Sequence, residues 1–165
     1  YRVSCLFVCK LSANGCSVEI GYHDRGQDYT QRDRVSIKLL LEDRSISVLA
    51  YNLETIMAEK LETVISRGDQ NTRPRDYYDI YILAKLQYAN IEPDALGAAL
   101  NATTEKRGSS TVVKEYRSIM DTVKSSEVMQ KQWKNYQKDF EYATDIALED
   151  ACDVVVELME NLGGE

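Results

Sequence analysis

The sequence of 165 residues has a mass of 18.8 kDa, the size of one ordinary domain or of two small ones packed together. With 44% hydrophobic and 28% charged residues, it has the composition of a folded protein, which excludes a disordered tail. The formal net charge of −7 argues against a protein that coats nucleic acid without specificity, although a local basic cleft stays compatible with it.

Membrane and secretion signals are absent from the sequence pattern. No stretch approaches 18 consecutive apolar residues, so we expect no membrane span. The N-terminus has neither the basic start nor the apolar block of a signal peptide, and the missing Met predicts a start inside a longer reading frame. The sequence has four cysteines and no Cys-x-x-Cys pair: Cys5, Cys9, Cys16 and Cys152. This pattern indicates that they are reduced and act as small apolar residues of a cytoplasmic protein.

The first 51 residues show the pattern of β-strands. The pair Asn14-Gly15 tolerates the positive φ of a tight turn, so it predicts a hairpin between the first two strands. A polar loop is expected from about residue 23 to 34. The expected strands are residues 2–11, 16–22, 35–41 and 46–51.

Apolar residues at helical spacing dominate the rest of the chain. Asn52 is the expected cap of a helix over 53–67, which Gly68 would end. Further helices are expected at 74–88 and from about Asp94 onward. Apolar stripes follow toward the C-terminus, formed by Met129, Trp133, Tyr136, Phe140 and Ala143, and by Ala151, Val155, Leu158 and Leu162. The sequence therefore predicts an α+β fold.

Three charged residues fall on faces that the apolar pattern marks as buried. On a helical wheel Lys60 lies between Ile56 and Val64, where a lysine must snorkel to solvent, pair with an acid or serve a site. Asp76 and Asp79 share the apolar side of the next helix, with Cβ atoms about 5–6 Å apart. A lysine or a divalent cation would compensate them.

Simpler explanations remain open for each of these charges. The stem of Lys60 can lie along the edge of the core. Acids in the first turn of a helix favour its dipole, which accounts for Asp76 adequately and for Asp79 less well.

Three arginines precede the two acids. Arg67, Arg73 and Arg75 stand near the start of a helix whose first turn suits Pro74, and guanidinium groups with free N–H groups recognise phosphate oxygens. A solvated basic loop is the alternative. A lysine, two acids and such a loop are typical of phosphoryl or nucleotidyl transfer, in which Mg²⁺ aligns a triphosphate and cationic side chains offset the charge on pyrophosphate.

These motifs resemble a known family. Residues 53–62 (LETIMAEKLE), the tripeptide 66–68 (SRG) and residues 73–81 (RPRDYYDIY) resemble the AbiEii-type nucleotidyltransferases, toxins of the type IV toxin–antitoxin, abortive-infection systems of bacteria and archaea. Residues 133–138 and Tyr142-Ala143 are similar to the C-terminal helical region of that family. The resemblance covers most of the chain, and residues 1–45 match it only as a strand pattern.

The resemblance implies a DNA polymerase β-like nucleotidyltransferase fold. Residues 1–52 would be a remnant of its β-sheet, and residues 53–165 would form the helical region with the C-terminal bundle. Roles follow for the site residues: Asp76 and Lys60 catalytic; Lys60, Arg67, Arg73, Arg75 and Asp79 binding nucleotide or phosphate; Glu19 a candidate metal ligand. Arg75 replaces a lysine usual in the motif, and strand alternation alone also explains a solvent-facing Glu19.

Two family motifs are missing from these 165 residues: the Gly-Gly/Ser turn with its basic residue, and the Asp-x-Asp pair that holds metals. We therefore expect a C-terminal portion that is inactive by itself. The intact protein would use Mg²⁺ and an NTP to transfer a nucleoside monophosphate to an acceptor, with tRNA as the candidate, and would belong with a cognate antitoxin. The alternative is a noncatalytic helical module that binds a partner protein or RNA, with Lys60–Asp76 a structural ion pair.

Aromatic residues near the C-terminus also have two interpretations. Trp133, Tyr136 and Phe140 are candidates for stacking on nucleic-acid bases. Their helical spacing favours core residues instead. The single histidine, His23, lies in a polar loop, which argues against a hydrolase centred on histidine.

Overall fold

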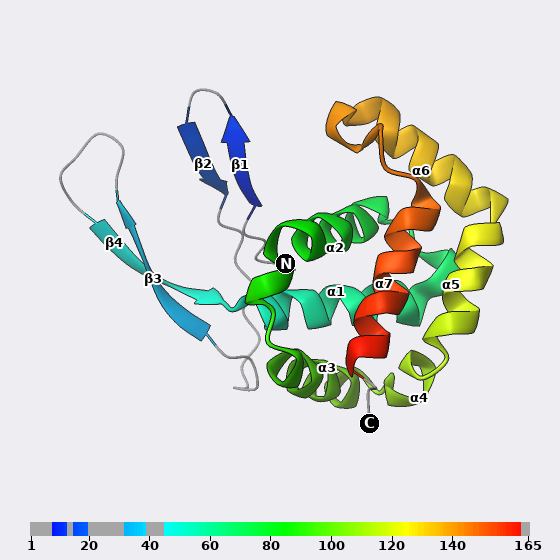
Figure 1. Cartoon of the computed structure of the whole chain (residues 1–165), viewed down its shortest axis with the longest axis horizontal. Coiled ribbons are helices and arrows are strands. Elements are labelled where there is room, and N and C mark those ends of the chain that lie inside the picture. The colour runs from blue at the N-terminus through cyan, green and yellow to red at the C-terminus, as the bar shows by residue number, and fades with distance from the viewer. Residues whose placement is uncertain (1–7, 13–14, 20–31, 39–44, 163–165) are drawn as a thin grey trace.

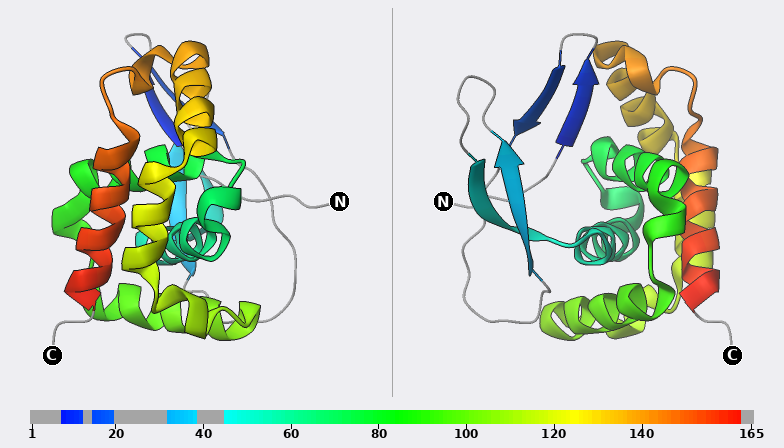
Figure 2. Two further views of the ribbon diagram at one scale, coloured as in Figure 1. Left: turned by 90° about the vertical axis from the view of Figure 1, so that its right-hand side faces the viewer. Right: turned by 60° about the vertical axis from the view of Figure 1, so that its left-hand side comes forward.

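The computed structural model of the chain describes residues 8–12, 15–19, 32–38 and 45–162, with side chains from Tyr51 onward. Four strands precede the helices: β1 (Val8–Ser12), β2 (Gly15–Glu19), β3 (Arg32–Lys38) and β4 (Ser45–Tyr51). β1 pairs antiparallel with β2, and β3 pairs antiparallel with β4. Figures 1 and 2 show both hairpins on one side of the helical part of the chain.

The predicted α+β fold with a partial polymerase β-like sheet is wrong. The described strands form two separate two-stranded hairpins and no larger sheet, and the chain is predominantly helical. Alternating apolar residues mark a strand but not its neighbour in space, and hairpin pairing is satisfied locally. The predicted strand residues 2–7, 20–22 and 39–41, together with Asn14 of the predicted turn, lie outside the described residues.

Helices make up nearly all of the chain from Leu53 to Leu162. The α-helices are α1 (Leu53–Arg67), α2 (Pro74–Gln87), α3 (Pro93–Arg107), α4 (Ser110–Val113), α5 (Tyr116–Ser125), α6 (Glu127–Asp139) and α7 (Leu148–Leu162). Short 3₁₀ turns lie between some of them: η1 (Gly68–Gln70), η2 (Tyr88–Asn90) and η3 (Glu141–Ala143). The division into two domains at residue 52 stays a prediction.

Local sequence signals determine where the first helices begin and end. The side chain of Asn52 accepts a hydrogen bond from the Thr55 N–H at 3.0 Å, which caps α1 as predicted. Gly68 ends the same helix with φ of +51°, a conformation that favours glycine. Pro74 and Pro93 each stand at the first position of α2 and α3, where a missing N–H costs nothing.

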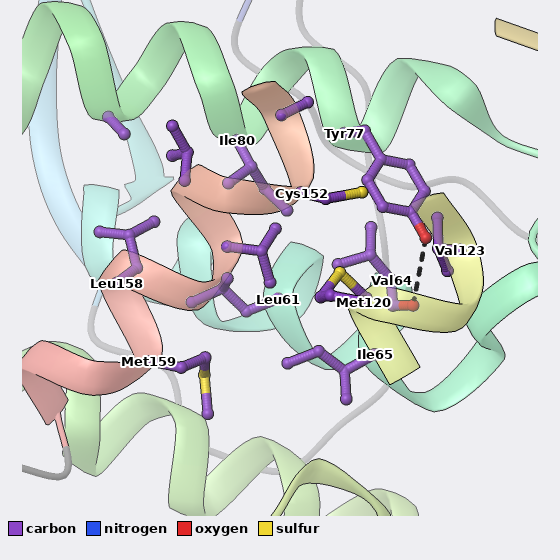
Figure 3. Packing of buried hydrophobic residues seen from close by; sticks show 14 of the residues in the cluster. Leu61, Val64, Ile65, Tyr77, Ile80, Met120, Val123, Cys152, Leu158 and Met159 are labelled. Carbon is purple, nitrogen blue, oxygen red and sulfur yellow. Dashed lines mark hydrogen bonds between the residues drawn. The ribbon is translucent and has the colours of Figure 1, made fainter. Parts of the chain in front are cut away.

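The core is built around α1. This helix packs against α2 and α3, while α7 packs against α2 and α5. Figure 3 shows how side chains from four helices meet, and the Tyr77 hydroxyl reaching the Val64 carbonyl across α1 and α2. The fully buried residues at this junction include Met57, Leu61, Val64, Ile65, Tyr77, Ile80, Met120 and Val123.

The predicted apolar stripes are mostly buried, with two exceptions. Trp133, Tyr136 and the members of the α7 stripe other than Leu162 lie in the core, as their spacing predicts. Leu162 is only partly buried at the end of α7, and Phe140 is 40% exposed because the chain leaves α6 there in an extended conformation. Outside these stripes, Leu86 is 72% exposed near the end of α2. Periodicity alone does not reveal where a neighbouring helix stops covering a stripe.

Cys152 is a buried free thiol on α7. Burial raises the pKa of this thiol to about 12, so it stays protonated and packs as a small apolar residue, as predicted. The side chains of the other cysteines lie outside the described part. Among the described residues, no helix is both long and apolar enough to cross a membrane.

Replacing Gly68 by alanine should destabilise the protein by about 1–3 kcal/mol, because the residue has positive φ and its new Cβ would lie 3.2 Å from Ile119 Cγ2. Gly108→Ala is the matched control: it also has positive φ, but nothing lies within 4 Å of the added atom. We expect it to cost about 1 kcal/mol. Urea unfolding measures both changes, and an equal or smaller cost at Gly68 would contradict the packing argument.

Candidate functional site

The structure brings Lys60, Asp76 and Asp79 into direct contact. Lys60 Nζ donates hydrogen bonds to Asp76 Oδ1 at 3.1 Å and to Asp79 Oδ2 at 2.7 Å. Their side chains are only 8%, 17% and 14% exposed, respectively. The lysine on the inner face of α1 therefore pairs with both acids of α2, and its stem does not simply follow the edge of the core.

Burying these three charged side chains is energetically unfavourable unless all three are present and paired. Two carboxylates one turn apart repel each other, and removing them from water is unfavourable without a cation between them. The Lys60 ammonium supplies that cation and satisfies one oxygen of each acid. The three side chains thus join α1 to α2 through charge as well as through apolar packing.

Arg75 extends the cluster toward solvent. Its Nε lies 3.8 Å from Asp79 Oδ2, and about half of its side chain is exposed. Lys60 and Arg75 therefore balance the two acids, while the guanidinium keeps free edges for an anionic ligand.

The other two predicted arginines lie close along the chain but do not join the cluster. Arg67 is exposed in the last turn of α1, and Arg73 is exposed at the N-cap of α2. Within residues 51–162, neither forms an ion pair with Asp76 or Asp79. A phosphate site made by all three arginines stays a prediction.

The segment between α1 and α2 is held by two residues that the sequence analysis missed. Asn71 is completely buried, and its Oδ1 accepts a hydrogen bond from the Arg73 N–H at 2.9 Å. The Tyr77 hydroxyl lies 3.5 Å from the carbonyl oxygens of Val64 and Gly68 at the end of α1. An asparagine shortly before Arg-Pro signals such a turn. Tyr77 carried no comparable signal, because its role depends on the tertiary contact.

The hydroxyl of Tyr77 is a donor that stays protonated. Burial raises its pKa well above the ordinary value, and this outweighs the hydrogen bond with Asn71, which lowers it. Tyr77 therefore acts by positioning: it ties the first turns of α2 to the last turn of α1, and so sets how Asp76 and Asp79 meet Lys60.

The described residues do not form a magnesium site. No group of three or more His, Cys, Asp or Glu side chains gathers among them in a way that could hold a metal ion. Asp76 and Asp79 are already paired with the Lys60 ammonium, which takes the place of a cation between them. Glu19 ends β2 opposite Val8, and its side chain lies outside the described part, so its metal role stays a prediction.

Comparison with protein families places this cluster in context. The family model for the nucleotidyl transferase AbiEii toxin of the type IV toxin–antitoxin system matches residues 10–155. The chain belongs to the AbiEii family. Searches of curated proteins and of solved structures found no match.

The match confirms the resemblance drawn from the sequence, and it includes the whole of α1 and α2 with the cluster between them. Membership of the AbiEii family indicates a nucleotidyltransferase toxin with an antitoxin partner. The roles of the individual site residues stay predictions.

Replacing Lys60 by methionine should lower the free energy of unfolding by about 3–5 kcal/mol, because two largely buried carboxylates would lose their cation. Lys114→Met, at an exposed position on the molecule, is the control and should change stability by less than about 0.5 kcal/mol. Chemical denaturation followed by circular dichroism measures both. A Lys60→Met protein as stable as the control would show that the cluster carries little of the α1–α2 contact.

Proposed function

We propose that the protein, as an AbiEii toxin, transfers a nucleoside monophosphate from an NTP to an RNA acceptor, for which the 3′ end of tRNA is the candidate. The observation that carries this proposal is the ammonium group of Lys60 held between Asp76 and Asp79. The cluster lies inside the segment that matches the nucleotidyl transferase family.

The reaction requires a base and several cations. The acceptor hydroxyl attacks the α-phosphorus, a new P–O bond forms, the bond to the β-phosphate oxygen breaks, and pyrophosphate leaves. In the proposal Asp76 accepts the hydroxyl proton, and Lys60 and Arg75 offset negative charge on the departing pyrophosphate.

The arrangement of charges supports these roles. Among the residues whose side chains are described, Asp76 touches Lys60 but no arginine, whereas Asp79 contacts both Lys60 and Arg75. Asp79 is thus the acid that holds the cations in place, and Asp76 is less constrained to accept a proton. Arg67 and Arg73 are exposed on the same connection between helices and are proposed as further phosphate contacts.

Mg²⁺ is proposed to enter with the NTP. The two aspartates of the cluster are already paired with Lys60, so its protein ligands are expected outside the residues whose side chains are described, with Glu19 as the candidate on β2.

A noncatalytic module is the second candidate, and one observation favours it. Lys60 already makes hydrogen bonds to both acids, as a purely structural bridge would. In that case the helices would bind a partner protein or RNA, and the charges would serve only to fix α1 against α2. Nucleotide transfer by Asp76→Asn and by a matched control variant distinguishes the enzyme from the noncatalytic module.

The decisive measurement is transfer of label from each α-labelled NTP to total tRNA with Mg²⁺, using the full-length protein. Asp76→Asn keeps the shape of the side chain but removes its basicity, so transfer should fall by about 100-fold or more. Asp121→Asn, an exposed acid on α5, is the control and should leave transfer unchanged. Circular dichroism shows whether each variant is folded.

Two results would count against the proposal. Labelling by Asp76→Asn at the wild-type rate would show that Asp76 is not catalytic, while the protein would still be a nucleotidyltransferase. Absence of labelling with every NTP would favour the noncatalytic module. The 165-residue chain, assayed beside the full-length protein, is expected to be inactive because it lacks the Gly-Ser turn and the Asp-x-Asp pair.

A further inference from the structure

A cluster of aromatic rings lies where α2 meets the end of α6. The Tyr142 ring is 4.8 Å from that of Tyr78 and 5.4 Å from that of Phe140, measured between ring centroids. Tyr136 lies beneath them, 4.8 Å from Phe140 and 6.0 Å from Tyr78. We call Tyr78, Phe140 and Tyr142 the aromatic patch.

The patch is partly exposed but firmly supported. Phe140 is 40% and Tyr142 is 49% exposed, whereas Tyr136 and Trp133 below them are buried. The hydroxyls of Tyr136 and Tyr142 lie 3.3 Å apart, and Trp133 Nε1 donates to the Ile146 carbonyl at 2.9 Å. The rings are therefore preorganised, and their outer faces remain open to a ligand.

This exposure differs from that of other surface apolar residues. Leu86, Tyr88, Val112 and Val128 are also exposed among the described residues, but none takes part in a ring cluster of this kind. Single exposed apolar side chains are ordinary, whereas contiguous ones mark a binding surface.

The patch borders the charged cluster. Tyr78 lies one turn after Arg75 on α2 and directly before Asp79, so these three side chains share one side of the helix. The Tyr78 ring packs against that of Tyr142, and the next residue, Asp79, lies 3.8 Å from the Arg75 guanidinium. The half-exposed guanidinium of Arg75 therefore lies next to the Tyr78 edge of the aromatic patch.

We propose that the aromatic patch is the base subsite for the NTP, whose base stacks on Phe140 and Tyr142 while Arg75 contacts its phosphates. The inference rests on the proposed function, because it names where the donor nucleotide binds. Stacking on such rings requires only a flat π-face, and the guanidinium complements the negative phosphates.

The acids beside Phe140 favour a single nucleotide over a strand of RNA on the rings, even though the exposed Lys134 and Lys138 lie earlier on α6. Asp139 and Glu141 flank Phe140 in the chain, and both are exposed. They would repel the phosphates of a strand that passed over the rings. A nucleoside triphosphate avoids them when its phosphates point toward Arg75 on α2.

Equilibrium binding of the four α,β-methylene nucleoside triphosphates to the full-length protein tests the subsite without turnover. Phe140→Ala and Tyr142→Ala should each weaken binding of the preferred nucleotide by about 5- to 100-fold, the usual effect of losing a stacked ring. Neither should change binding of inorganic tripolyphosphate, which has no base. Arg75→Ala should weaken the binding of both the nucleotide and tripolyphosphate.

Two further variants are the controls. Tyr88→Ala removes an exposed tyrosine from η2 and should leave both ligands bound as in the wild type. Tyr142→Phe keeps the ring and loses the hydroxyl, so it should retain most of the nucleotide affinity even though its contact with Tyr136 is lost.

Three outcomes would overturn the inference. If Phe140→Ala and Tyr142→Ala bind the nucleotide as tightly as the wild type and still transfer it to tRNA, the patch is not the base subsite, and the proposed function is unaffected. Loss of binding to a single-stranded RNA oligonucleotide, with nucleotide affinity unchanged, would assign the patch to the acceptor. A wild-type protein that neither binds an NTP nor labels tRNA would end the proposed function and the subsite together.

Discussion

The contact of one lysine with two aspartates is the constraint on which the helical structure depends. Lys60 projects from the buried face of α1, and both acids project from α2 toward it. The three charges are tolerable away from water only when they meet, so the two helices must hold one relative position. Gly68, Asn71 and Tyr77 establish that position at the connection between the helices.

The same constraint links stability to chemistry. The charges of Lys60, Arg75, Asp76 and Asp79 nearly cancel, so most of the cluster can be buried. It nevertheless places charged groups at the edge of the core, where a ligand can reach them. Arg75 carries the cluster to the surface, and the ring of Tyr78 lies beside it on α2. The helices that bury Leu61 and Val64 thereby present acids, a guanidinium and open aromatic faces at one place.

Much of the helical part could be predicted because its signals are local. Asn52 and Gly68 bound α1, and prolines begin α2 and α3, since caps and turns depend on residues only a few positions apart. The pairing of strands depends on partners in space, so the expected sheet was wrong and two hairpins stand in its place. The exposure of Leu86 depends likewise on where neighbouring helices end.

The sequence by itself determined the family, the bounds of the first helices, and the three charges on apolar faces, because motif spacing and helical periodicity are properties of the chain alone. Only the tertiary structure decided that Lys60 pairs with both acids at once, that Arg75 alone of the three arginines joins them, and that Phe140 lies open beside Tyr142. These outcomes depend on the packing of α1 against α2 and of α6 near α2, which bring together residues far apart in the chain.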